Sequence, residues 1–359
     1  MARSLCSIAL LIAAASCGVA DKEERAKPRQ PDGASTVIMP TRQHAIVLTM
    51  QQKALRASME AALAPISGRR GASVRILGTR TRVDAGYDGL MPQQSVSKLW
   101  VAMTLAEQVS AGRRRYDDVV TVNSADRALF HQPLARLTSR GPVTLTVGDL
   151  LVRSLTQSDN MANDILLRIV GGPESVRDWL TRNAPEIRFG PGDRAMQSAV
   201  SGLAWDPRFA DRQEFERARR AVPGDVRGRL YAAYAADPVD GASARSIAIV
   251  LSKIADGSVP GSTDILTVME RSRTGHARLR SGLPSGWRLF HKTGTGQTWN
   301  GRTAGFNDVG VMVSPTGRGY AVAVMIGDSS SDTASMQKSI SSVARAVVAY
   351  DAATISQPL

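Results

Sequence analysis

The sequence is poor in cysteine, in aromatic residues and in long apolar runs. Its 359 residues include only two cysteines, Cys6 and Cys17, so the chain beyond residue 17 carries no thiol. This absence excludes disulfides and cysteine catalysis from most of the chain, whose stability must come from an apolar core. No apolar run reaches the roughly 20 residues that a membrane-spanning helix needs.

The first twenty residues have the composition of a secretory signal peptide. Arg3 is their only charge, residues 8–15 are apolar, and small residues follow as far as Ala20. A basic start, an apolar middle and a small-residue exit are typical of cleaved export signals. We therefore expect an exported protein, periplasmic or secreted, with no transmembrane segment in the mature chain. The alternative is a lipoprotein anchored to the membrane through a lipid on Cys17. Residues 21–45 are polar, and we interpret them as a flexible tether.

The chain is strongly basic. Its 45 Lys and Arg against 32 Asp and Glu give a formal charge of +13. A positive field of this size can attract nucleic acid. The basic clusters at residues 69–70, 113–115 and 217–220 nevertheless lack interleaved aromatic residues that could stack on bases. We interpret the charge as a solvated surface and expect no nucleic-acid partner.

Strand-like segments gather toward the two ends of the chain. They occupy residues 73–77, 82–85, 287–291, 308–313 and 320–326. Apolar residues at helical spacing precede them from Leu55 to Ile66 and follow them from Ile340 to Val348. The sequence therefore predicts an α/β sandwich, with a largely antiparallel sheet of about five strands and the N- and C-terminal helices on one face.

Strand signals nearly vanish between residues 113 and 255, where helix-like runs replace them, among them a basic helix at residues 213–221. We interpret residues 113–255 as an all-helical lobe inserted into an α/β lobe, which comprises residues 46–112 and 256–359. The two lobes would form one catalytic domain, residues 46–359, with a cleft between them.

A Ser-x-x-Lys pattern occurs twice. On a helix this spacing puts the hydroxyl and the amine on one face, and a serine needs such a base to act as a nucleophile. Ser95-Val96-Ser97-Lys98 opens an apolar helix, whereas Ser335-Met336-Gln337-Lys338 lies at the exposed start of the C-terminal helix. The pattern alone does not distinguish the two copies.

The order of two further motifs does distinguish them. Ser158-Asp159-Asn160 lies in the helical region, Lys292-Thr293-Gly294 ends a strand, and only Ser95 precedes both. With these three motifs in this order, the chain resembles the class A β-lactamases and the penicillin-binding proteins. The resemblance runs from about residue 50 to residue 350.

The resemblance implies roles for the residues of the first two motifs. Ser95 would attack the substrate carbonyl, and Lys98 would take up its proton or relay it. Ser158 would pass a proton to the leaving nitrogen. Asn160 would hold the amide of the substrate's side chain.

The resemblance also implies that the Lys-Thr-Gly strand binds the substrate. Lys292 and Thr293 would face the substrate carboxylate, with Arg302 as a second cation. Backbone N–H groups of the nucleophile and of Thr295 would form the oxyanion hole. Gly294 would let the strand edge approach the substrate with no side chain in the way.

The two lysines of these motifs would lie close together. Ammonium groups about 5 Å apart repel by roughly 3 kcal/mol at an effective dielectric near 20, which lowers one pKa by about two units. We therefore expect Lys98 to be a neutral base near neutral pH and Lys292 to stay charged.

Release of the acyl group is the step at which the resemblance fails. Class A β-lactamases activate a water with a glutamate in a Glu-x-x-Leu-Asn loop after the Ser-Asp-Asn motif, and this chain has no such pattern. Asp193 is the candidate base, with Glu186, Glu214 and Glu216 as alternatives. Without an activated water the acyl ester would persist.

The expected function is that of a serine β-lactamase acting outside the cytoplasm. The alternatives are a D,D-peptidase or other acyl transferase acting on a peptidoglycan peptide, and a protein that binds β-lactams without hydrolysing them. The four histidines, His44, His131, His276 and His291, lack metal-ligand spacing, and neither a metal nor an organic cofactor is implied.

Overall fold

A computed structural model describes residues 48–355. The signal peptide predicted over residues 1–20, Cys17 and the tether predicted over residues 21–45 lie outside the described residues, so they stay predictions. Within residues 48–355, no helix is long and apolar enough to cross a membrane.

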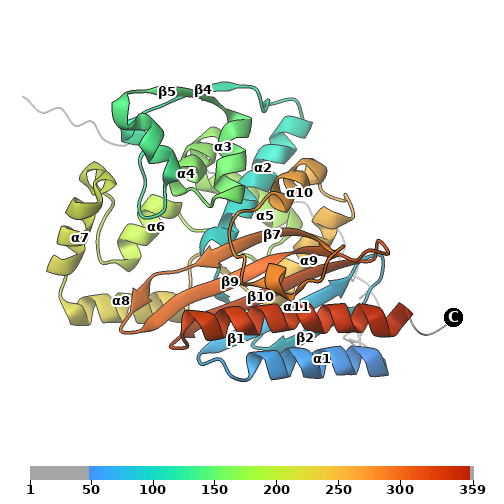
Figure 1. Ribbon diagram of the computed structural model, residues 1–359. Coiled ribbons are helices and arrows are strands. Elements are labelled where there is room, and N and C mark those ends of the chain that lie inside the picture. Colours follow the sequence, from blue (N-terminus) through green and yellow to red (C-terminus); the bar gives the residue numbers. More distant parts are fainter. Residues whose placement is uncertain (1–47, 356–359) are drawn as a thin grey trace, which may run out of the picture. The chain divides into compact units, whose positions relative to one another are not determined.

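A sheet of antiparallel strands forms the centre of the described chain (Figure 1). Its strands are β1 (Arg69–Ile76), β2 (Arg82–Gly86), β7 (Arg288–Thr295), β8 (Thr298–Trp299), β9 (Arg302–Val313) and β10 (Gly319–Ser329). Five of them run in the order β2-β1-β10-β9-β7, and the short β8 pairs with β9. The predicted antiparallel sheet of about five strands is confirmed.

The middle strand is buried along most of its length. β10 pairs with β1 on one side and β9 on the other, and every residue from Tyr320 to Gly327 is buried. Side chains alternate between the two faces of a strand, so a strand that is apolar on both faces must be covered on both. Helices therefore lie on both faces of this sheet.

The terminal helices cover one face, as predicted. They are α1 (Met50–Leu63) and α11 (Thr333–Ile355). They pack on one another below the sheet in the view of Figure 1. Ile340, Val343 and Val347 of α11 recur at helical spacing and share one apolar core with Val322 and Val324 of β10.

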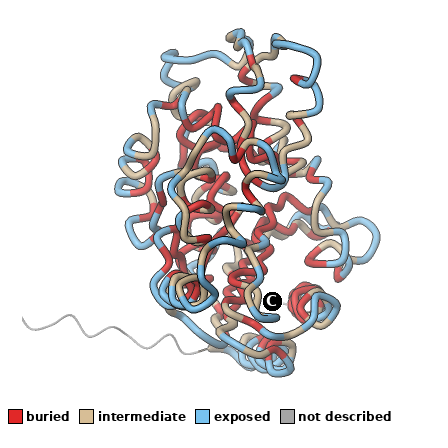
Figure 2. The backbone as a smooth tube through the Cα atoms, turned by 90° about the vertical axis from the view of Figure 1, so that its left-hand side faces the viewer, coloured by how far each residue is buried: buried red, intermediate tan, exposed pale blue. Residues whose placement is uncertain are grey.

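The other face is covered by helices that also build the second lobe. The relevant elements are α2 (Lys98–Ser110), α3 (Val147–Thr156), α4 (Asn160–Ile169), α5 (Gly172–Asn183), α9 (Ala244–Ala255) and α10 (Ser262–Glu270). Every residue from Lys98 to Ala106 is buried, because α2 runs through the middle of this second core. Figure 2 shows the buried backbone inside the described chain, with exposed loops around it.

The segment predicted as all-helical, residues 113–255, also contains strands. A hairpin is formed by β4 (Val119–Val122) and β5 (Val143–Thr146), and β6 (Gly241–Ala242) pairs with β3 (Met91–Pro92). Strands of two to four residues are too short to show a period of two in the sequence. In addition, α9 packs on β1 and β10, so the helical lobe ends before α9.

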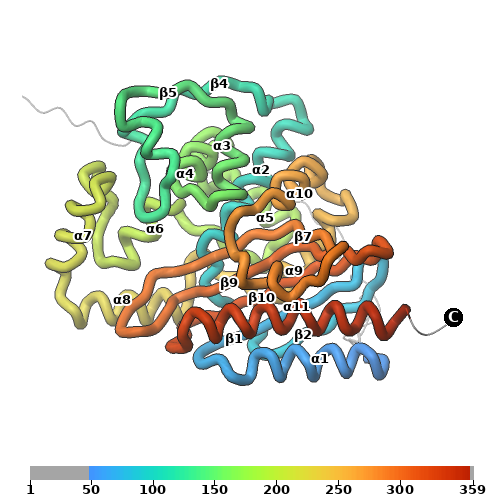
Figure 3. The backbone as a smooth tube through the Cα atoms, viewed as in Figure 1, coloured from blue at the N-terminus to red at the C-terminus, as the bar shows by residue number. Residues whose placement is uncertain are grey.

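Three further helices follow one another along one edge of the described chain (Figure 3). They are α6 (Asp193–Val200), α7 (Arg212–Ala221) and α8 (Gly224–Ala236). The predicted basic helix at residues 213–221 is α7. Met196 of α6 packs with Tyr231 and Tyr234 of α8, whereas α7 packs through Phe215. Short 3₁₀ helices connect these elements: η1 (Gln94–Ser97), η2 (Ser124–Asp126), η3 (Pro133–Arg140), η4 (Pro207–Ala210) and η5 (Leu279–Gly282).

Candidate active site

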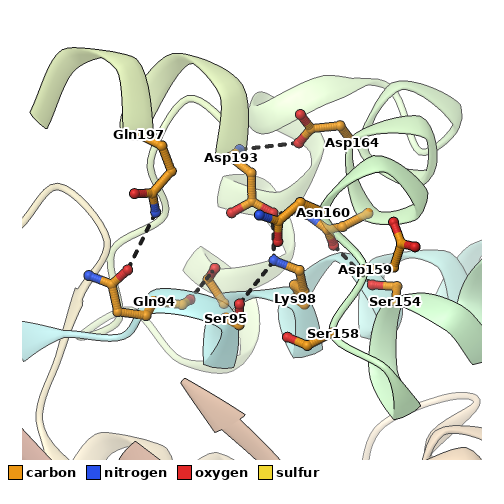
Figure 4. Close-up of polar contacts among 12 residues, drawn as sticks. Gln94, Ser95, Lys98, Ser154, Ser158, Asp159, Asn160, Asp164, Asp193 and Gln197 are labelled. Atoms are coloured by element: carbon orange, nitrogen blue, oxygen red, sulfur yellow. Dashed lines mark hydrogen bonds and ion pairs between the residues drawn. The ribbon is translucent and has the colours of Figure 1, made fainter. Parts of the chain in front are cut away.

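The predicted nucleophile lies at the start of a buried helix. Ser95 belongs to η1, which leads directly into α2. Lys98 is fully buried, and its Nζ lies 3.2 Å from the Oγ of Ser95 (Figure 4). The amine is therefore placed to exchange a proton with the hydroxyl.

The second copy of the Ser-x-x-Lys pattern lies at the surface. Ser335 is in the first turn of α11, and its hydroxyl donates to the carboxylate of Asp332 at 2.6 Å. Lys338 is exposed one turn further on. This copy forms a helix start, as predicted.

Asp193 completes the group around Lys98. It is the first residue of α6, it is buried, and its Oδ2 lies 2.5 Å from the Nζ of Lys98. The side-chain amide of Asn163 donates to the same oxygen at 3.2 Å. Of the four predicted carboxylates, Asp193 is the one that the fold brings to the lysine beside the nucleophile.

The other three candidate carboxylates have different surroundings. Glu214 pairs with Arg217 and Glu216 with Arg219, both within α7. Glu186 is exposed. Of these three, Glu216 alone lines the cavity that holds the nucleophile.

Asp164 fixes the start of α6 and so the position of Asp193. Its Oδ1 accepts from the backbone N–H of Asp193 at 3.2 Å, and its Oδ2 accepts from the Nε of Arg194 at 2.9 Å. Burial and the nearby charge of Asp193 raise the pKa of Asp164 to about 6. Two adjacent buried carboxylates are costly unless cations face them, and Lys98 and Arg194 supply those cations.

Ser158 lines the cavity, and Lys292 contacts it from β7. Lys292, on β7, is fully buried, and its Nζ donates to the Oγ of Ser158 and to the carbonyl of Thr293, both at 2.9 Å. Burial, followed by the charge of Lys98, holds the pKa of Lys292 well below its usual range. The expectation that Lys292 keeps an ordinary pKa and stays charged is therefore corrected. The structure gives Lys98 a carboxylate partner, Asp193, and gives Lys292 uncharged oxygens.

The Ser-Asp-Asn motif occupies the entry to α4. Asp159 caps this helix, because its Oδ1 accepts from the N–H of Ala162, and its Oδ2 accepts from the N–H of Leu134. Asn160 donates to the carbonyl of Leu129 at 2.8 Å and lines the cavity. The cap thus fixes the asparagine for which the resemblance implies binding of an amide.

Gly294 lets β7 pass close to the nucleophile's backbone. A Cβ at this position would lie 2.4 Å from the carbonyl oxygen of Gln93. Side chains alternate along a strand, so Thr293 and Thr295 point together into the cavity while Gly294 faces away from it. The expectation that Gly294 makes room for substrate is corrected: it makes room for the turn that carries Ser95.

Arg302 is not part of the site. Its Nε and Nη2 donate to the two carboxylate oxygens of Asp328 at 2.8 and 2.7 Å. On β9, the residue opposite Lys292 is Val309, seven positions along the strand from Arg302 and so more than about 20 Å away. The prediction that Arg302 faces the substrate carboxylate is wrong, because a count along the chain ignores the hairpin that reverses β7 into β9.

A different arginine supplies a cation to this end of the cavity. Arg278 lines the cavity, and it donates to the carbonyls of Gly294 and Asn307 at 3.0 and 2.6 Å and to the Oγ1 of Thr295 at 2.6 Å. Burial lowers its pKa to about 10, so it stays charged near neutral pH. No local spacing in the sequence marks Arg278, because tertiary packing brings it to β7.

Sequence reasoning also missed the network that holds the nucleophile's turn. Gln94 has a φ of 55°, a conformation that residues with side chains rarely adopt. Its N–H donates to the carboxylate of Asp240 at 2.8 Å, and its side chain donates to the hydroxyl of Tyr234 at 2.7 Å. Tyr234 in turn donates to Asp240 at 2.9 Å. This buried network holds a strained backbone directly before Ser95.

The nucleophile and its neighbours border one cavity of about 640 Å³. Ser95, Ser158, Asn160 and Asp193 line it, whereas the two lysines are buried. A serine beside an amine, a carboxylate that can take the proton further, and cations for an anionic substrate define a serine hydrolase that works through an acyl-enzyme.

Comparison with known proteins identifies the family within this class. The model of the β-lactamase enzyme family matches residues 53–351. Extended-spectrum β-lactamase PER-1 of Pseudomonas aeruginosa is 27% identical over 270 residues, which are 74% of this chain and 77% of that protein. β-Lactamase VEB-1 of the same organism is 25% identical over 295 residues, which are 81% of this chain and 88% of that protein.

Solved structures share the fold. The TLA-1 extended-spectrum β-lactamase has a TM-score of 0.69 at 22% identity, covering 84% of this chain and 99% of that one. A β-lactamase from Chitinophaga pinensis has a TM-score of 0.68 at 23% identity, covering 83% of this chain and 99% of that one. The chain belongs to the β-lactamase enzyme family, as a serine enzyme of class A.

Proposed function

We propose that the protein hydrolyses β-lactams through an acyl-enzyme on Ser95, with Asp193 as the base that releases the acyl group. The observation that carries this proposal is a continuous chain of contacts. It runs 3.2 Å from the Oγ of Ser95 to the Nζ of Lys98, and 2.5 Å from that Nζ to the Oδ2 of Asp193. The chain connects the nucleophile to a carboxylate that lines the same cavity.

In acylation, the Oγ of Ser95 forms a bond to the lactam carbonyl carbon. Its proton passes to Lys98, which gives one of its own protons to Asp193. The lactam C–N bond then breaks, and the nitrogen takes the hydroxyl proton of Ser158. The proton held at Asp193 replaces the one that Ser158 gave, which restores the carboxylate. The backbone N–H groups of Ser95 and Thr295 stabilise the oxyanion.

In deacylation, Asp193 takes a proton from a water, and the oxygen of that water attacks the ester carbon. The ester C–O bond breaks, and Ser95 regains its proton from Asp193 through Lys98. An aspartate is one methylene shorter than the glutamate of other class A enzymes. The contacts from Asn163 and from the start of α6 support its role, because they hold the short carboxylate in one position.

The ring carboxylate of the substrate has a polar site of its own. Thr293 and Thr295 offer hydroxyls on one face of β7, and Arg278 lies against them with its charge. Lys292 lies beneath, donating to Ser158. This arrangement supports a substrate whose anionic group lies at the β7 end of the cavity.

We further propose that the protein acts after export, in the periplasm or outside the cell. The support is the signal-peptide composition of residues 1–20. The mass of the mature protein distinguishes the two forms of export: a cleaved peptide leaves an unmodified chain, whereas lipid modification at Cys17 adds acyl groups.

The enzymatic proposal is tested with a chromogenic cephalosporin, followed by absorbance and by intact protein mass. The wild type is expected to turn over many equivalents. Ser95→Ala is expected to show neither turnover nor an adduct, whereas Ser335→Ala, the same change in the surface copy of the motif, is expected to match the wild type. A stable adduct without turnover would contradict hydrolysis and favour a D,D-peptidase or a binding protein. Turnover by Ser95→Ala would contradict the nucleophile.

A further inference from the structure

Helix α7 brings a charged face to the catalytic cavity. Arg212, Glu216 and Arg219 line the same cavity as Ser95. Residues spaced by four and then three positions lie on one side of a helix, so these three side chains point the same way. The cavity therefore has a charged wall that no catalytic motif includes.

Aromatic contacts hold this face in place. The buried ring of Phe215 meets the ring of Phe130 edge-on, with centroids 5.4 Å apart, and meets Phe209 at 5.7 Å. Phe130 also lines the cavity, from a loop that precedes the Ser-Asp-Asn motif. At the start of α7, the carboxylate of Asp211 caps the helix by accepting from the N–H of Gln213. Packing and capping therefore both fix the orientation of α7, which lies at the left of the view in Figure 1.

Cations outnumber carboxylates on this wall. Glu216 pairs with Arg219 at 3.2 Å, whereas Arg212 makes no ion pair with any residue between 48 and 355. A third arginine, Arg227 of α8, lies over the ring of Trp299 at 4.2 Å. Burial and the charge of Arg219 lower the pKa of Arg227, which places the two guanidinium groups within one electrostatic field. Of these three arginines, Arg212 and Arg219 line the cavity beside Glu216 and leave its wall with a net charge of +1 (2 − 1), whereas Arg227 borders the smaller hollow next to Arg219.

This wall comes from α7, whereas the site for the ring carboxylate lies at β7, where Arg278 donates to the hydroxyl of Thr295. Gln197 and Gln297 also line the cavity and share a hydrogen bond of 2.7 Å, and Arg219 borders a smaller hollow beside Gln297. A β-lactam carries its ring carboxylate and its acyl side chain at opposite ends of the molecule. Its side chain therefore extends toward α7.

We propose that Arg212 and Arg219 form a subsite for a carboxylate on the acyl side chain, so that the enzyme favours β-lactams that carry one. This inference rests on the β-lactam hydrolysis proposed above, and it adds the class of substrate. The ring carboxylate and the side-chain carboxylate would each meet its own cations, Arg278 at β7 and the wall on α7. A neutral side chain would gain nothing from the second set.

Two penicillins that differ by one carboxylate test the subsite. Benzylpenicillin has an uncharged side chain, and its α-carboxy analogue has an anionic one. The double variant Arg212→Gln/Arg219→Gln is expected to lower kcat/KM for the analogue about fivefold to tenfold more than for benzylpenicillin. Glu216→Gln is expected to raise the preference for the analogue, because it removes the wall's carboxylate. Arg217→Gln changes the same helix at an exposed residue paired with Glu214, and it should leave the preference unaltered.

Two measurements distinguish a binding subsite from a purely structural role for these arginines: the salt dependence of the preference, and the change in kcat/KM for each of the two penicillins. The preference for the analogue should shrink as NaCl rises from about 50 mM to about 500 mM, because ions screen exposed charges. An equal fall in kcat/KM for both penicillins in the double variant would overturn the subsite. An unchanged preference in all variants would also overturn the subsite. If those variants still hydrolyse benzylpenicillin, the proposed function would be unaffected. Absence of turnover by the wild type would overturn both.

Discussion

The carboxylate of Asp193 and the amine of Lys98 form a buried ion pair, with Oδ2 and Nζ 2.5 Å apart. Both side chains are withdrawn from solvent, so removal of either partner would leave an uncompensated buried charge. Because the same amine also reaches Ser95, a single carboxylate can take part in both chemical steps. In the proposed mechanism it accepts a proton through Lys98 during acylation and directly from water during release of the product.

Replacement of that carboxylate separates the two steps. Asp193→Asn cannot accept a proton from water, so kcat is expected to fall about 10²–10⁴-fold. Acylation loses the transfer from Lys98 to Asp193 but keeps Lys98 beside the nucleophile as a proton acceptor, so it should slow less than deacylation. A β-lactam adduct should therefore accumulate on Ser95. Steady-state hydrolysis and intact mass after mixing measure the two effects. Glu214→Gln, an exposed carboxylate on α7, is the matched control and should keep its kcat.

The outcome that contradicts this role is specific. If Asp193→Asn keeps the wild-type kcat, the base is another group, and Glu216 is the remaining candidate that lines the cavity. If the variant forms no adduct at all, acylation depends on Asp193 as strongly as deacylation does, and the expected separation of the two steps is wrong.

Local patterns explain which parts of the site could be predicted. Ser95 and Lys98 follow from a spacing within one helical turn together with the order of the Ser-Asp-Asn and Lys-Thr-Gly motifs, each of which is a short pattern. The strands and the terminal helices follow from apolar periods of two and 3.6. Each of these signals is contained in a few consecutive residues.

The missed residues act across the fold. Arg278 reaches β7 through packing, and Asp240 reaches Gln94 from 146 positions further along the chain. Arg302 shows the converse error, because a count along the sequence placed it near Lys292 whereas the hairpin carries it away. No local sequence pattern shows where the chain reverses direction, so tertiary contacts of this kind cannot be predicted from local patterns.

Arg278 and Arg302 test whether tertiary contacts, and not the count along the sequence, identify the arginine that serves the substrate. Arg278→Gln removes a charge from the β7 end of the cavity and is expected to lower kcat/KM about 10–100-fold, since hydrogen bonds to charged groups contribute about 1.5–3 kcal/mol. Arg302→Gln breaks an exposed pair with Asp328 and should change kcat/KM less than about threefold. Initial rates with one cephalosporin measure both. The reverse ranking would return Arg302 to the substrate site.

Two glycines distinguish close packing from open space. Gly294→Ala would put a Cβ 2.4 Å from the carbonyl of Gln93, so we expect a loss of about 1–3 kcal/mol in the free energy of unfolding and a displaced nucleophile. Gly224→Ala, in the first turn of α8, meets nothing within 4 Å and should be neutral or stabilising. Urea denaturation and hydrolysis rates report the two effects. A fully stable and active Gly294→Ala would contradict the close approach.

The depressed pKa of Lys292 predicts how activity depends on pH. As pH rises through that pKa, the lysine loses its charge at a lower pH than an ordinary lysine, whose pKa is about 10.4, and kcat/KM for an anionic β-lactam should fall. Lys292→Arg keeps its charge in alkali, so the fall should move to higher pH. Lys253→Arg is the control, because Lys253 donates to the carbonyl of Asn183. Profiles of the wild type and Lys292→Arg that fall together would assign the transition to another group.

The Asp240 network predicts how stability depends on pH. Burial raises the pKa of Asp240 to about 6, against 3.8 for an ordinary aspartate. Between these two values the folded protein keeps a proton that the unfolded chain has lost, so the free energy of unfolding falls as pH rises from about 4 to about 6. A shift of about two units corresponds to about 3 kcal/mol. Asp240→Asn does not titrate, so its stability should change less over this range.

Urea denaturation at about pH 4 and about pH 6.5 gives the change in the free energy of unfolding for the wild type and for Asp240→Asn. The difference between these two changes is the contribution of Asp240, because Asp164 titrates in both proteins and cancels. Asp225→Asn, an exposed aspartate paired with Arg229, gives the control. Asp240→Asn also has one carboxylate oxygen fewer to accept from the hydroxyl of Tyr234 and the N–H of Gln94. The strained turn before Ser95 should then relax, and the activity of Asp240→Asn should fall. If the variant is as pH-dependent as the wild type, Asp240 does not carry the titration. If the variant keeps full activity, the network does not hold the nucleophile.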